Sequence, residues 1–160
     1  MQDEAITTFK GVNKTYSMVF FALILLLLIS SIYVSNLGAV LTYDAVLFTY
    51  LQAISIATTA IFLVFAYVYP QAKLKKIPPD SSLPDKMSRY RELITHRLIL
   101  IGAAGLATCV FFILTADTNL MVVLAIILIF LILSRPTPFK VKADLALSEE
   151  EKKITHAINP

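Results

Sequence analysis

Residues 20–29 read FFALILLLLI, an unbroken apolar run that contains no charge, glycine or proline. Around this run, an uncharged and mainly apolar stretch extends from about residue 16 to residue 35. A helix of about 20 residues is long enough to cross the ~30 Å hydrocarbon core of a bilayer. The stretch therefore predicts a transmembrane helix. A cleaved signal peptide is the alternative, but the run is longer than a signal core and the preceding segment contains Asp3 and Glu4.

Three further apolar stretches follow, at about residues 45–69, 98–116 and 120–134. The last would reach only ~22 Å as a helix, so we expect it to recruit flanking residues or to lie where the bilayer is thin. The chain is 58% hydrophobic and 16% charged, against about 45–50% and 25% in soluble domains. The sequence thus predicts an all-α membrane protein with four transmembrane helices in two helical hairpins, and it excludes a large extramembrane domain.

All 14 Lys and Arg residues fall in three of the five segments that flank these stretches. Two lie in the N-terminal segment, seven in the central loop and five in the tail, whereas residues 36–44 and 117–119 contain none. Because basic residues stay in the cytoplasm, both termini and the central loop are predicted there, and a bacterial inner membrane is favoured. The predicted organisation is a cytoplasmic N-terminus (1–15), a first hairpin (16–69), a basic cytoplasmic loop (70–97), a second hairpin (98–134) and a cytoplasmic tail (135–160).

Prolines and capping residues predict where helices begin and end in the segments between and after the apolar stretches. Pro70 is expected to end the second helix, and a new helix is expected from Asp85, with Arg89 four residues later as its ion-pair partner. Asp117 is placed to cap the fourth helix. In the tail, residues 148–151 read SEEE, which matches a capping box and predicts a short amphipathic C-terminal helix.

Polarity within the apolar stretches is mild and lies on one face of the second one. The residues concerned are spaced as one helical stripe: Thr49, Gln52, Ser55 and Thr59. Such side chains form hydrogen bonds between transmembrane helices. The alternative interpretation is that they line a path for a substrate.

Small residues dominate the first half of the third stretch and are typical of close helix packing in membranes. They are Gly102, Ala103, Gly105, Ala107 and Cys109. Packing within one subunit and contact with a second subunit are both consistent with this pattern.

The central loop supplies a group of basic residues at the expected membrane surface. The members are Lys73, Lys75, Lys76, Arg89, Arg91, His96 and Arg97. They predict contact with anionic lipid headgroups or a partner protein, although topology signalling alone accounts for many such residues. The expected partners are membrane lipids and either another protein or further copies of the chain, with no nucleic acid.

Catalytic and metal-binding motifs are not found. The single Cys and the two widely spaced His residues form no ligand cluster, and no phosphate-binding loop or nucleophile motif occurs, so we predict no catalytic residue, metal or cofactor. The favoured function is a non-catalytic subunit, assembly factor or interaction protein of a membrane complex. The alternatives are a homo-oligomeric channel or transporter for a neutral or lipophilic substrate and, third, a lipid-modifying enzyme at the cytoplasmic face, in which His96 would act.

Overall fold

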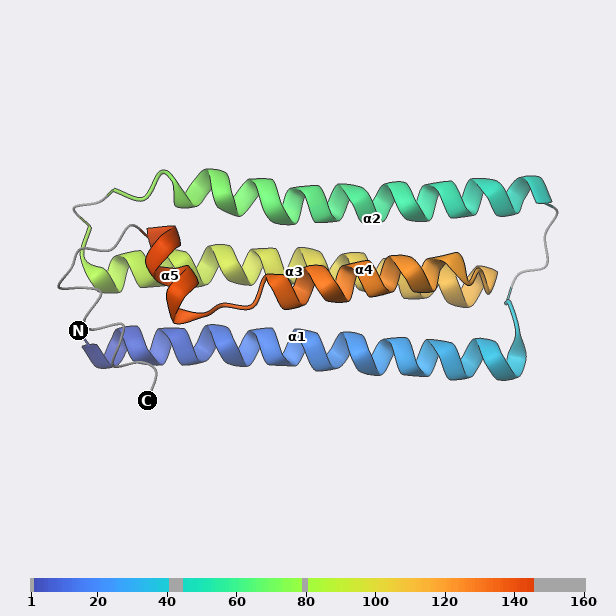
Figure 1. Ribbon diagram of the computed structural model, residues 1–160, viewed down its shortest axis with the longest axis horizontal. Helices are drawn as coiled ribbons and strands as arrows, with labels where there is room; N and C mark the ends of the chain where they lie inside the picture. The colour runs from blue at the N-terminus through green and yellow to red at the C-terminus, as the bar shows by residue number, and fades with distance from the viewer. Residues whose placement is uncertain (1, 41–44, 79–80, 146–160) are drawn as a thin grey trace.

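The structure, a computed structural model, describes residues 2–40, 45–78 and 81–145. These residues form five helices: α1 (Gln2–Leu37), α2 (Ala45–Leu74), α3 (Leu83–Thr115), α4 (Asn119–Leu133) and α5 (Pro138–Leu145). Helices α1, α2 and α3 run side by side along the long axis of the molecule, and α4 lies along α3 (Figure 1). The short helix α5 lies at the end of the bundle where α1 begins (Figure 1).

Three helices in the described part of the chain are long and apolar enough to cross a membrane. Their apolar spans are Thr7–Leu37, Val46–Leu74 and Leu83–Thr115. They indicate an integral membrane protein, and the predicted all-helical, apolar character of the chain is confirmed. Helix α4 is more apolar than these three helices but has only 15 residues, as the sequence led us to expect.

Helix α3 is the centre of the bundle. It contacts α1, α2, α4 and α5, and it buries a larger share of its apolar span than α1 or α2 does. Helix α4 buries Leu120, Leu124, Ile127 and Leu131, which lie on one stripe at helical spacing. The outer surfaces of α1 and α2 remain apolar and exposed.

Two predicted helix boundaries are wrong. Helix α2 continues through Pro70 to Leu74. Pro70 is buried, so packing offsets the hydrogen bond that a proline removes from the helix. Helix α3 begins at Leu83 rather than Asp85, because Pro84 lies in its first turn, where the missing proline N–H needs no partner.

The tail also differs from the prediction. Helix α5 was not predicted, since its segment contains Pro138 at the first position and only eight residues. The predicted C-terminal helix near Ser148 lies outside the described residues.

Side-chain oxygens shape the turn between α3 and α4. Ala116 ends α3 in the left-handed conformation, with φ of 51°, and its N–H donates to the Phe112 carbonyl at 2.8 Å. Asp117 Oδ1 then accepts the N–H of Asn119, the first residue of α4, at 2.9 Å. The N-cap position of α4 is Thr118, which makes no side-chain cap hydrogen bond, so the predicted cap position is wrong by one residue, although Asp117 still accepts an N–H at the start of the helix.

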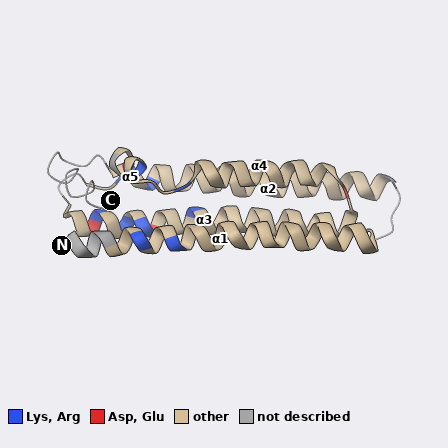
Figure 2. Ribbon diagram, turned by 60° about the horizontal axis from the view of Figure 1, so that its bottom comes forward, with Lys and Arg blue, Asp and Glu red and all other residues tan. Residues whose placement is uncertain are grey.

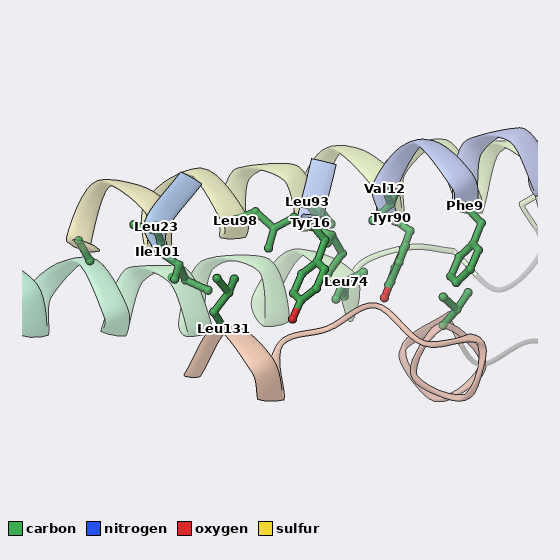
Figure 3. Close-up of a cluster of buried hydrophobic side chains, with 14 of the residues drawn as sticks. Phe9, Val12, Tyr16, Leu23, Leu74, Tyr90, Leu93, Leu98, Ile101 and Leu131 are labelled. Carbon is green, nitrogen blue, oxygen red and sulfur yellow. The ribbon is translucent and has the colours of Figure 1, made fainter. Parts of the chain in front are cut away.

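Charge is distributed unevenly along the bundle. Figure 2 shows Lys and Arg gathered toward the end where α1 begins, whereas the opposite half is almost entirely uncharged. At the basic end, Phe9, Val12 and Tyr16 of α1 pack with Tyr90 of α3 in the buried cluster shown in Figure 3. The basic end thus rests on a packed apolar core.

Candidate functional site

The polar stripe of α2 turns gradually into the bundle. Thr49 is exposed and Gln52 is half-buried, whereas Ser55 and Thr59 are buried. Thr59 Oγ1 lies 2.8 Å from Thr108 Oγ1 of α3. Because Thr108 donates its own proton to the Ala104 carbonyl at 2.8 Å, Thr59 is the donor between the two hydroxyls. The stripe therefore forms an interhelical hydrogen bond between α2 and α3.

Removal of this hydrogen bond gives a first prediction. Thr59→Val and Thr108→Val, alone and together, should give a coupling energy between about 0.6 and about 1.7 kcal/mol, the average and the maximum found for hydrogen bonds between membrane helices. The free energy of unfolding in detergent provides the measurement. The matched control is Thr58→Val, at the neighbouring position of the same helix. Strictly additive single and double variants would show that the hydroxyl pair contributes nothing.

The small residues of α3 lie close to α1. A methyl group built on Gly105 would overlap the Leu23 side chain, and one built on Gly102 would lie 3.6 Å from Cγ1 of Val19. Cys109 is a buried free thiol, and Ala103 and Ala107 are half-buried. In this chain the close approach of α1 and α3 thus uses the glycines of the predicted packing face.

A cavity of about 330 Å³ lies between the end of α2 and the beginning of α3. Its lining residues are Tyr69, Lys73, Lys76, Ile77, Arg89, Glu92 and Leu93. Three of the predicted basic residues therefore share one site: Lys73 at the end of α2, Lys76 in the turn that follows it and Arg89 in α3. We call this site the basic cavity.

Contacts around the basic cavity orient its cationic groups. The ammonium of Lys73 lies 5.9 Å from the centre of the Tyr69 ring, within the range of cation–π attraction. Arg89 Nε lies 3.4 Å from Asp85 Oδ2, so the predicted ion pair is confirmed. Both partners of this pair are about half exposed, which limits its contribution to stability and leaves the guanidinium accessible.

The other predicted basic residues do not line the basic cavity. The His96 ring packs edge-on against Tyr69, with centroids 6.5 Å apart, and its Nδ1 donates to the backbone carbonyl of Glu92 at 3.1 Å. Lys75 is exposed, and Arg91 lies near Gly11 of α1. The basic residues that we predicted as one group from the sequence therefore lie in different places in the fold.

Arg97 is the most buried of these basic residues, with only 8% of its surface exposed. Its guanidinium carbon lies 5.5 Å from the Tyr67 ring centre and 6.0 Å from that of Phe130. It thus joins α3 to α2 and α4 by packing on aromatic faces. This side chain therefore packs within the bundle, between three helices.

Helix α5 adds two charged groups that sequence reasoning did not assign to any site. Burial raises the pKa of Asp144, and the nearby Lys140 and Arg97 oppose that shift. Burial also lowers the pKa of Lys140, whose ammonium donates to the Leu133 carbonyl at the end of α4. Val141 and Leu145 are buried, so α5 is held by both apolar and polar contacts.

Four members of the basic cavity were not predicted as site residues: Tyr69, Ile77, Glu92 and Leu93. Tyr69 carries a detectable signal, because an aromatic ring with a polar tip is favoured at a membrane interface. Glu92 and Leu93 face the cavity only because α2 and α3 align in this register. Within the described ranges, no group of three or more His, Cys, Asp or Glu residues is arranged to hold a metal ion.

Comparison of the chain with protein-family models, with curated proteins and with solved structures finds no match, so the functional interpretation depends on the residues and their geometry.

Proposed function

We propose that this protein is a non-catalytic interaction protein, either a subunit or an assembly factor, of a membrane complex. In this proposal α4 also crosses the bilayer, which gives two transmembrane hairpins, and the basic end faces the cytoplasm. The complete restriction of Lys and Arg to three alternate segments supports that orientation.

The distribution of exposed apolar side chains over α1 and α2 is the main support for an interaction role. Most large exposed side chains of α1 and α2 within their spans are apolar, and examples are Phe21, Ile29, Ile61 and Val64. These two helices pack mainly on α3, so each keeps a long apolar face. In a membrane such faces contact lipid or the helices of another protein.

The contacts of the polar residues give less support to the alternatives. The Thr59 hydroxyl is engaged by Thr108, which supports a packing role for this member of the stripe. His96 donates a hydrogen bond to a backbone carbonyl, and this contact does not prepare the imidazole for acid or base catalysis.

Site-specific crosslinking tests the proposal. A photo-reactive side chain at Ile29 of α1 or Val64 of α2, which are 54% and 59% exposed, should yield a discrete protein adduct in native membranes. The same variants purified and reconstituted alone in lipid vesicles are the control. Mass spectrometry of the complex released by a mild detergent should find the same partner at a constant ratio.

The interaction proposal would be contradicted if both positions gave only lipid adducts and the chain emerged from native membranes as a monomer. An adduct of twice the chain mass that also forms in the vesicles would identify the partner as a second copy of this chain.

A further inference from the structure

We infer that the basic cavity binds a phosphate group, carried by an anionic lipid headgroup or free in solution. This inference is independent of the proposed interaction role, because it concerns a cavity between two helices of one chain. The basic cavity is the place where predicted basic residues from both α2 and α3 line one hollow.

The volume of the basic cavity and its expected depth in the membrane fit a lipid headgroup. Small-molecule sites commonly enclose about 300–1,000 Å³, and the basic cavity, at about 330 Å³, lies at the lower limit of this range. Its lining begins at Tyr69, near the end of the apolar stretch of α2, and continues through Lys73 to Ile77. If α2 crosses the bilayer, this places the cavity at the level of the lipid phosphates.

The charges favour an anion. Lys73, Lys76 and Arg89 line the cavity together with one acidic residue, Glu92, and Asp85 pairs with Arg89 from outside the lining. A guanidinium can hold two phosphate oxygens at once, whereas an ammonium acts as a point charge. The positive excess that remains suits a phosphate diester, and Tyr69 contributes a hydroxyl that can donate to a phosphate oxygen.

A comparison of matched variants tests whether this is a site or diffuse attraction. The full chain in nanodiscs of phosphatidylcholine should bind added phosphatidylglycerol, as measured by native mass spectrometry. Lys73→Gln with Lys76→Gln should weaken binding at least about 10-fold, since each variant loses a charge-assisted contact with the phosphate inside the cavity. Lys10→Gln with Lys14→Gln, two exposed lysines of α1, should change binding less than about twofold. Equal losses in the two pairs would overturn the inference.

A variant that is expected to strengthen binding controls for loss of binding through misfolding. Glu92→Gln removes the carboxylate from the cavity lining and should strengthen phosphatidylglycerol binding about fivefold, an effect that a loss of structure cannot produce. Unchanged or weaker binding by this variant would also overturn the inference.

The source of the phosphate is resolved by competition. Inorganic phosphate at millimolar concentration should compete with phosphatidylglycerol if the cavity takes free phosphate, and should leave lipid binding unchanged if the headgroup and its acyl chains are both required. Absence of binding by either probe contradicts the inference.

Discussion

Gly105→Leu should destabilise the folded bundle by about 1–3 kcal/mol, the usual cost of inserting a larger side chain into a packed interior. Gly105 is buried on α3, and even a single methyl group at this position would overlap the Leu23 side chain of α1. A leucine there must separate α1 from α3 or force unfavourable rotamers. The free energy of unfolding, measured by helix content during titration of a mild-detergent micelle with SDS, reports the change.

The neighbouring glycine provides the control. A methyl group at Gly102 would meet Val19 at 3.6 Å, an ordinary contact, and alanine favours a helix by about 1 kcal/mol over glycine. We therefore expect Gly102→Ala to be neutral or stabilising, and Gly105→Ala to be less favourable. Leu23→Ala should restore part of the stability lost in Gly105→Leu. A Gly105→Leu protein that unfolds at the same SDS fraction as the natural chain would contradict close packing of α1 on α3.

The helical, membrane-embedded character of the chain was predictable because it depends on local patterns. An uncharged run such as residues 20–29 has few stable alternatives to a helix in lipid, where every backbone N–H needs a partner within the segment. The pairing of Asp85 with Arg89 and the hydrogen bond from the Asn119 N–H to Asp117 also depend on residues only a few positions apart.

Features that depend on the alignment of different helices were not predictable. Pro70 normally stops a helix, but in this chain it is buried within α2. The basic cavity joins Lys73 to Arg89 and Glu92 across the turn between α2 and α3, and the burial of Arg97 against Tyr67 and Phe130 involves three helices. Charge and spacing identified the basic residues, but only the fold divides them between a cavity and the bundle interior.

The proposed function depends on the cytoplasmic position of the basic end and on the crossing of the bilayer by α4. Single cysteines at exposed positions report them, in a Cys109→Ala background that removes the buried native thiol. The positions are Lys75 after α2, Thr118 between α3 and α4, and Phe139 of α5, which is 81% exposed. The reagent is a membrane-impermeant maleimide, applied to sealed right-side-out vesicles before and after they are opened with detergent.

Thr118→Cys should be labelled almost completely in sealed vesicles, whereas Lys75→Cys and Phe139→Cys should be labelled only after the vesicles are opened. Labelling of Phe139→Cys together with Thr118→Cys in sealed vesicles would contradict the crossing by α4, and labelling of Lys75→Cys there would contradict the cytoplasmic position of the basic end.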